Sequence, residues 1–575
     1  MSKIKSRQAF AQAKSVGFSG IGSQAPLSLA GAADMCNFRI CADGRLKTRN
    51  GYKALSAFGS SDESIRGVWE GLCSGNRLCF VACGQTVYLF DATTKSATPV
   101  GTLSGTEGTV SFFCYEDDVY LLDGEAIQIY RKSNQRFEAS VPYAPLLGHN
   151  WDPTSFGDVN EEPNLLTTHM RIHYYNSAGT KTFFFPYSVS GVDVVRVNNS
   201  VTTAYTFTKG ANFLTLTTSE VPTIVEVGIR VEINEEVRKR IFSSAYAYVH
   251  SKSEQGKEYV LLYGGENDPS LYHTVPVATT DLNYCKIYYR QADKLYIRSK
   301  DILTLGDRDH PVTSLCPMYD SVLAFDGIQT HLLSFTSTEI TSSRIFAYGS
   351  VFKGRCPVIL GKPVILNDNG VFLLNLPISK PEAITAKRIS DNTGSYLPTG
   401  MRASALGHFD IEKGELWICT TEDTAGKVLA WNAQREEWYR FDNIGATAFF
   451  ECSFGKGFAK GNLLYVFDDL LFTDDGKAIT AYYQSNYFDL GVVEAPRRAL
   501  RVSLCANADG CDAALELATE RGTKTRALLH RAVGEAPKHY DFRFGIHRHR
   551  FLRFCIRTEG NAPCEVYKIA FFANP

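Results

Sequence analysis

A short hairpin recurs along most of the chain, and this recurrence constrains the fold more than any other feature. Each copy is a strand, a tight polar turn and a second strand that often closes on aspartate. Copies occupy residues 77–91, 110–124, 317–327, 363–374, 414–431 and 460–468. A spacing of roughly 40 to 50 residues is typical of β-propeller blades. The sequence therefore predicts an all-β fold built on a β-propeller.

Composition supports a β fold and excludes several classes of function. The chain has 36 Phe and 29 Tyr but only 5 Met, which favours pleated sheets over helices. Lys and Arg total 60 against 61 Asp and Glu, so the net charge of -1 gives no global attraction for nucleic acid. No run of about eighteen apolar residues predicts a membrane helix, and Met1–Gln8 lacks the apolar core of a signal peptide. We expect synthesis and folding in a cytosol.

Breaks in the hairpin rhythm predict five regions. Residues 1–30 form an extended arm that docks on a neighbouring element or subunit and adds little core of its own. The first blades follow in 31–140, an inserted β-sandwich of about six strands in 163–235, the remaining blades in 241–490, and a C-terminal β-sheet or sandwich in 495–575. The fold class is thus a β-propeller with an inserted small β-sandwich and a terminal sheet domain.

Two hairpins are predicted inside the inserted sandwich. One joins Arg171–Tyr175 to Thr182–Phe185 around Ser177–Gly179, and the other joins Val192–Val197 to Thr202–Phe207 around Asn198–Asn199. After the sandwich, the charge run Glu235–Arg240 predicts a short helical turn.

The fifteen cysteines are dispersed, with no Cys-x-x-Cys pair. Most stand inside strand patterns, where a reduced thiol acts as a small hydrophobe. We interpret them as structural thiols and not as a zinc site.

Two clusters have residues that could carry chemistry. Asp468–Gly476 contains paired carboxylates that could hold calcium or act as acid and base, including Asp468 and Asp475. Asp and Gly are also standard hairpin-turn residues, and we favour the turn. His547 and His549 share one face of a strand, but the arginines that alternate with them favour a solvated basic strand or a subunit contact, with a phosphate contact left open.

Motifs for nucleophilic, metalloprotease or P-loop chemistry do not occur in the sequence. We therefore assign no catalytic, cofactor-binding or metal-binding residue, and we expect that the chain is not an enzyme.

An opening segment carries a family resemblance: Asn37–Ile40, Asp43–Leu46 and Arg49–Tyr52. Together with Tyr263–Asp268, the Asn-Asn hairpin and Tyr487–Gly491, it resembles the propeller-bearing tail proteins of tailed bacteriophages, especially the nozzle and packaged-DNA stabilisation components of short-tailed phages. The resemblance implies a ring, often sixfold, below the portal and adaptor, whose lumen holds or passes the genome. The high cysteine count departs from this pattern.

The resulting expectation is a structural virion protein in the phage tail, assembled in the host cytoplasm. Its expected partners are copies of itself in a ring, with a hexamer expected, the portal, adaptor and other tail proteins, and genomic DNA in transient contact, without membrane insertion. One alternative is a receptor-binding or glycan-binding tail protein, whose site would be formed by the terminal sheet and exposed aromatics such as Trp431 and Trp438. A second is a propeller polysaccharide hydrolase or lyase that depends on Asp468 or Asp475.

Overall fold

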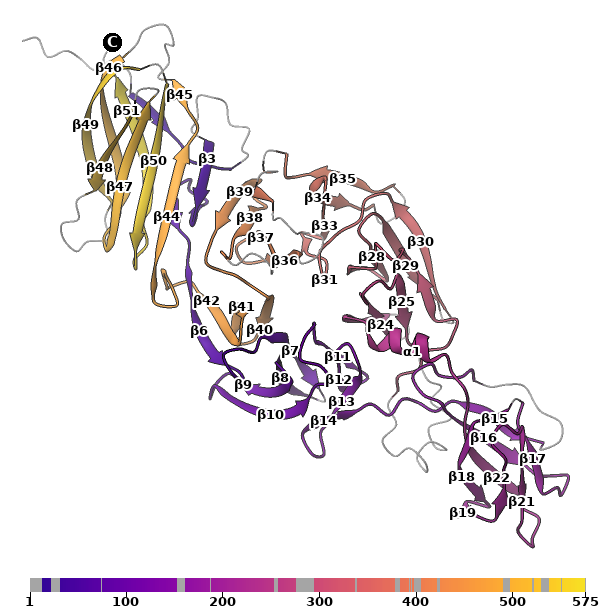
Figure 1. Cartoon of the computed structure of the whole chain (residues 1–575). Helices are drawn as coiled ribbons and strands as arrows, with labels where there is room; N and C mark the ends of the chain where they lie inside the picture. Colours follow the sequence, from indigo (N-terminus) through magenta and orange to yellow (C-terminus); the bar gives the residue numbers. More distant parts are fainter. Residues whose placement is uncertain are drawn as a thin grey trace, which may run out of the picture. The chain divides into compact units, whose positions relative to one another are not determined.

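The chain folds almost entirely into β-sheets, as a computed structural model shows (Figure 1). The structure describes residues 13–21, 31–73, 75–152, 161–186, 188–252, 257–275, 294–336, 339–377, 383–391, 393, 396–397, 405–420, 425–489, 497–519, 522–528, 537–549 and 551–573. The predicted all-β fold class is confirmed. Two compact units divide the chain: unit 1 is 1–65, 92–96 and 349–575, and unit 2 is 66–91 and 97–348.

Unit 2 contains four sheets in which neighbouring strands follow one another in the chain, the arrangement typical of propeller blades. The first is β7 (Ile65–Cys73), β8 (Asn76–Cys83), β9 (Thr86–Asp91) and β10 (Ser96–Thr102), and the second is β11 (Ser111–Tyr115), β12 (Asp118–Leu122), β13 (Ile127–Arg131) and β14 (Arg136–Ala139). The third is β23 (Tyr246–Lys252), β24 (Lys257–Tyr263), β25 (Ser270–His273) and β26 (Ile302–Thr304), and the fourth is β27 (Ser314–Met318), β28 (Ser321–Phe325), β29 (Thr330–Phe335) and β30 (Ile340–Phe346).

Unit 1 contains three further runs of neighbouring strands of this type, of which the first is a separate sheet and the other two are the ends of one 16-stranded sheet. The first is β32 (Val358–Ile359), β33 (Lys362–Asn367), β34 (Gly370–Asn375) and β35 (Thr385–Arg388). The second is β36 (Ala405–Asp410), β37 (Glu415–Thr420), β38 (Val428–Asn432) and β39 (Glu437–Phe441). The third is β40 (Ala448–Cys452), β41 (Gly455–Lys460) and β42 (Leu463–Asp468). The short strand β31 is Gly354–Arg355. Central strands such as β37 are buried along their whole length, whereas β35 is exposed along its whole length. Near-continuous apolar runs therefore mark strands that are covered on both faces.

A strand from the start of the repeat region completes the last of these sheets. β6 (Gly51–Ala57) pairs antiparallel with β42, from Gly51 opposite Asp468 to Ala57 opposite Leu463. The two ends of the repeat region are therefore joined in one sheet.

The insertion, defined here as residues 146–230 of unit 2, contains a five-stranded and a three-stranded sheet. The larger is β15 (Leu146–Trp151), β16 (His169–Tyr175), β22 (Ile224–Arg230), β18 (Gly191–Val197) and β19 (Ser200–Thr202), and the smaller is β17 (Thr182–Phe184), β21 (Phe213–Leu216) and β20 (Tyr205–Thr206). Its sheets begin upstream of residue 163.

Of the two hairpins predicted in the insertion, the turn at Asn198–Asn199 is confirmed, and the pairing around Ser177–Gly179 is wrong. Asn198 and Asn199 have φ of 47° and 69° between β18 and β19, as a two-residue hairpin turn requires. β16 and β17, in contrast, lie in different sheets, because β16 pairs with β22 and β17 with β21. The side chain of Asn176 donates to the carbonyls of Thr180 (2.8 Å) and Pro222 (2.7 Å), which anchors the turn between β16 and β17.

The charge run after the insertion forms α1 (Glu235–Phe242), the one α-helix of the described residues. Asn234 caps its N-terminus by accepting from the backbone of Glu236 and Val237. Among these residues, no helix has the length and hydropathy needed to cross a membrane.

The C-terminal part of unit 1 has two sheets, and both recruit N-terminal strands. One contains β46 (Arg497–Asn507), β49 (Lys538–His549) and β51 (Glu565–Ala573) with β1 (Ala13–Val16), β4 (Phe38–Ile40) and β5 (Leu46–Thr48). The other contains β44 (Lys477–Ser485), β45 (Phe488–Asp489), β47 (Cys511–Thr519), β48 (Gly522–Leu528) and β50 (Phe551–Gly560), and continues into β43 (Thr473–Asp474), β3 (Gly31–Cys36) and β2 (Ser19–Ile21). The terminal domain is therefore composite and not formed by residues 495–575 alone.

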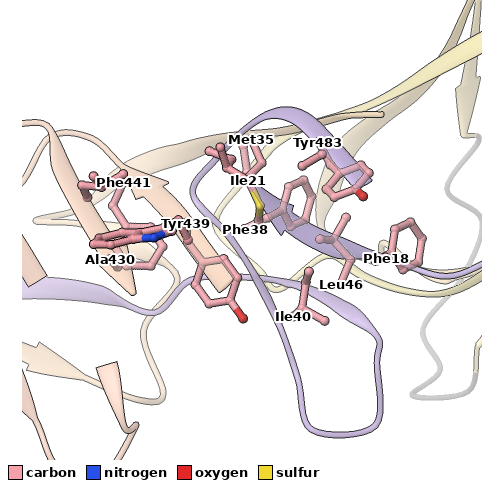
Figure 2. Close-up of a cluster of buried hydrophobic side chains, with 14 of the residues drawn as sticks. Phe18, Ile21, Met35, Phe38, Ile40, Leu46, Ala430, Tyr439, Phe441 and Tyr483 are labelled. Carbon is pink, nitrogen blue, oxygen red and sulfur yellow. The ribbon is translucent and has the colours of Figure 1, made fainter. Parts of the chain in front are cut away.

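The described part of the N-terminal arm belongs to this core, which corrects the expectation that the arm adds little to it. β1 pairs with β51, and β2 pairs with β3 and β39. Phe18 and Ile21 are buried, and Phe18 packs edge-on against Tyr483 with ring centroids 5.3 Å apart (Figure 2). Residues 1–12 and 22–30 of the predicted arm lie outside the described residues.

Candidate functional site: the buried Arg49 junction

Arg49 is the largest buried charged group of the opening segment, with 1% of its surface exposed. Its Nη1 and Nη2 donate to the two carboxylate oxygens of Asp474, at 2.8 and 2.6 Å. Its Nε donates to Oδ1 of Asn37 at 2.8 Å, and the carbonyls of Asn50 (3.1 Å) and Asp442 (2.9 Å) accept the remaining two donors. All five N–H groups of the guanidinium therefore have partners, which a buried arginine needs to offset its desolvation.

Asn37 sits at the centre of the same junction and is fully buried. Its side-chain amide donates to the carboxylate of Asp442 and to the carbonyl of Thr480 (2.8 Å). Its Oδ1 accepts from Arg49 and from the backbone N–H of Asp442 (3.1 Å). Its φ of 56° is in the left-handed region, which asparagine tolerates better than most residues.

The next residues of the opening segment are also constrained by packing. A Cβ on Gly51 would stand 1.9 Å from the carbonyl oxygen of Thr473, so only glycine fits between β6 and β43. The hydroxyl of Tyr52 donates to the carbonyl of Asn443 at 2.6 Å, and burial is the main reason that its pKa is raised above the ordinary value. The Arg-Asn-Gly-Tyr motif thus joins the start of the repeats to strands more than 400 residues later.

The carboxylates of Asp468–Gly476 are each occupied by local structure. Asp468 accepts from Lys53 Nζ (2.7 Å) and from the backbone N–H of Leu470 (3.0 Å), and the hydrogen bond from Lys53 is the main cause that lowers its pKa. Asp474 belongs to the Arg49 junction. Asp475 and Gly476 have φ of 50° and 81° in the turn between β43 and β44, and Asp475 accepts from the N–H of Ala54. The structure thus has a turn here, with Asp474 drawn into an ion pair.

The prediction that Trp431 and Trp438 are exposed is wrong, because each has only 2% of its surface exposed. They lie directly opposite each other on β38 and β39, inside the hydrophobic cluster part of which Figure 2 shows. The indole N–H of Trp438 donates to the carbonyl of Ile389 at 2.6 Å. Neither ring can stack on a ligand in this fold.

Some of the other residues singled out from the sequence lie outside the described residues. His547 and His549 lie on β49, but their side chains are outside the described residues, as is Cys285. Most of the other fourteen cysteines are buried. In the described ranges, no group of three or more His, Cys, Asp or Glu side chains is placed to hold a metal ion.

Sequence reasoning missed Asp442 and the role of Asp474. Asp442 directly follows β39 and Asp474 is the last residue of β43, and each looks like an ordinary turn aspartate in the sequence. Because their partners are Asn37 and Arg49, at the other end of the repeat region, no local pattern identifies them.

Comparisons with known proteins give no family for the chain. No protein-family model and no curated protein matches it. The solved structure of TmCBM61 in complex with β-1,4-galactotriose is 13% identical, covers 20% of this chain and 73% of its own, and has a TM-score of 0.15. The AfRom2 CNH domain is 6% identical, covers 73% of this chain and 99% of its own, and has a TM-score of 0.35. Likenesses at these scores carry no conclusion about function.

Proposed function

We propose that this chain is a structural protein of a tailed-bacteriophage virion: a nozzle-like ring of the tail that retains the packaged genome and forms part of the ejection channel. One observation carries the proposal. Five of the residues that carry the resemblance, Asn37 and Arg49–Tyr52, take part in the buried junction. The motif therefore serves to hold the architecture together, as expected of a protein whose task is mechanical.

Retention and release would be steric in this proposal. Loops that face a channel between subunits would narrow it before infection and move apart when the tail is triggered. The near-zero net charge of -1 fits this, because a strongly basic lumen would bind phosphates and slow the passage of DNA. The partners would be further copies of the chain, the portal and adaptor, and other tail proteins.

Each of the two alternatives named residues whose surroundings in the fold do not favour it. A glycan site at Trp431 and Trp438 would need exposed rings, and both are buried. A hydrolase or lyase at Asp468 and Asp475 would need convergent carboxylates, whereas these two accept hydrogen bonds from Lys53 and from the backbone of Ala54 and Leu470.

Labelling of phage particles tests the proposal. An antibody against the purified chain, applied to particles from the culture that produces it, should decorate the tail axis below the portal in electron micrographs. Absence of the chain from purified particles would refute the virion role.

A further inference from the structure

Large apolar side chains are exposed at turns of unit 1. Leu360, Ile411 and Leu470 are 83%, 71% and 88% exposed, respectively. Leu360 lies between β32 and β33, Ile411 between β36 and β37, and Leu470 after β42. Turns normally carry Gly, Asn, Asp, Ser or Pro, and an exposed leucine or isoleucine gains nothing there from burial. Leu360 also has a φ of 48°, which costs a branched side chain conformational energy.

Ion pairs hold two of these turns side by side. Lys413 Nζ, two residues after Ile411, lies 2.8 Å from a carboxylate oxygen of Asp469, the residue before Leu470. Lys456 Nζ contacts Asp410 at 3.1 Å and Glu412 at 3.4 Å. We call the surface formed by Ile411, Glu412, Asp469 and Leu470 the turn patch.

The turn patch presents negative charge around its apolar centre. Glu412 and Asp469 are exposed, while the lysines that pair with them are half-buried. A partner that covers Ile411 and Leu470 would therefore match the patch best with an apolar surface that carries arginine or lysine.

A second surface of the chain has this complementary chemistry. Tyr487 and Phe551 are exposed aromatic residues, and the guanidinium of Arg553 lies over the Tyr487 ring, 5.0 Å from its centroid. We call these three residues the sandwich patch, since Phe551 and Arg553 lie on β50. Aromatic residues and arginine are enriched at the centres of protein interfaces.

We propose that the turn patch of one copy of this chain docks on the sandwich patch of a second copy. The inference rests on the proposed ring and names its subunit interface. A contact between two different patches is heterologous, so an open assembly keeps a free turn patch at one end and a free sandwich patch at the other until the ring closes. The same patches meeting themselves would bring carboxylates against carboxylates, or arginine against arginine, which disfavours a two-fold contact.

Paired substitutions test the apolar part of the interface. The variant Ile411→Ser/Leu470→Ser changes only exposed side chains, so it should fold normally. Sedimentation of the purified chain, and of tails from particles, should show association weakened at least about tenfold. Leu72→Ser is the matched control, because Leu72 is equally an exposed leucine, in unit 2, and should leave association unchanged.

A charge exchange tests the direction of the complementarity. Glu412→Lys and Arg553→Glu should each weaken association, and the double variant should restore most of it. Loss in both singles without recovery in the double would contradict pairing between these surfaces.

Cysteine cross-linking tests which copy supplies which patch. A chain with Ile411→Cys, mixed with a chain carrying Phe551→Cys and oxidised with diamide, should give a disulfide-linked dimer with one chain of each kind. Wild-type chain treated alike is the control for its own thiols.

The outcomes separate this inference from the proposed function. A tail ring that survives in Ile411→Ser/Leu470→Ser overturns the docking but leaves the ring. Normal self-association with failure to join particles assigns the turn patch to a different protein and also overturns it. A chain present as a single copy away from the tail axis overturns both.

Discussion

Replacing Arg49 by methionine should loosen the buried junction while the chain remains folded. Methionine fills much of the same volume but offers none of the five donors that Asp474, Asn37, Asn50 and Asp442 accept. Asp474 would lose both donors to its carboxylate while it stays buried. Removing one partner of a buried ion pair costs about 3–5 kcal/mol.

That cost becomes a measurable change in local opening. At about 1.4 kcal/mol for each factor of ten, strands at the junction should open roughly 150-fold to 4,000-fold more often. Amide hydrogen exchange reports such opening strand by strand, which suits a chain of two units better than one global melting temperature. Peptides from 463–485 should exchange faster, and peptides from 111–131 in unit 2 should not change.

Lys387→Met is the control for the Arg49 experiment. Lys387 and Glu436 form an exposed pair 2.6 Å apart in the same unit, and such a pair contributes only about 0–1 kcal/mol. If Arg49→Met changed exchange no more than Lys387→Met, the junction would not hold the two ends of the repeat region together.

Three further predictions concern other parts of the chain. Deleting residues 1–21 should lower the melting temperature of unit 1, because β1, β2 and the buried Phe18 are lost; an unchanged melt would restore the view of a dispensable arm. Trp438→Phe should destabilise unit 1 by about 1–3 kcal/mol in urea unfolding, because the carbonyl of Ile389 loses its donor, and an unchanged midpoint would contradict that bond. Glu226 is buried, which raises its pKa above the ordinary value of 4.5 against the opposing charges of Arg196 and Arg171. The contribution of Glu226 to folding stability is therefore complete below pH 4.5 and is lost as pH rises through the folded-state pKa. Glu226→Gln should raise the melting temperature of the insertion at pH 7 and not at pH 4. A lower melting temperature at pH 7 would show that the ionised carboxylate is the stabilising form.

Local features of the fold were predictable because they depend on neighbouring residues. Asn198–Asn199 and Asp475–Gly476 form turns with positive φ, and Glu235–Phe242 forms a capped helix. In each case the residues that fix the backbone lie within a few positions of one another.

Long-range pairings were not predictable from the same patterns. The sheet partners of β6 and β1 are β42 and β51, near the other end of the chain, and alternation alone does not say which strands pair. The assumption that adjacent strands form hairpins failed at β16 and β17 for this reason.

The candidate site was predictable only in part. The opening segment stood out in the sequence, but its residues proved to bind one another and strands of the last repeats. The error at Trp431 and Trp438 has a related cause: strands covered on both faces and half-exposed strands can carry the same aromatic residues, and only the packed sheets distinguish them.

The most direct test of the central claim is electron cryomicroscopy of intact particles, with this chain fitted into the density. The account predicts a closed ring of identical copies around the tail axis below the portal, with DNA or an open channel at its centre. A single copy away from the axis, or particles that lack the chain, would contradict it.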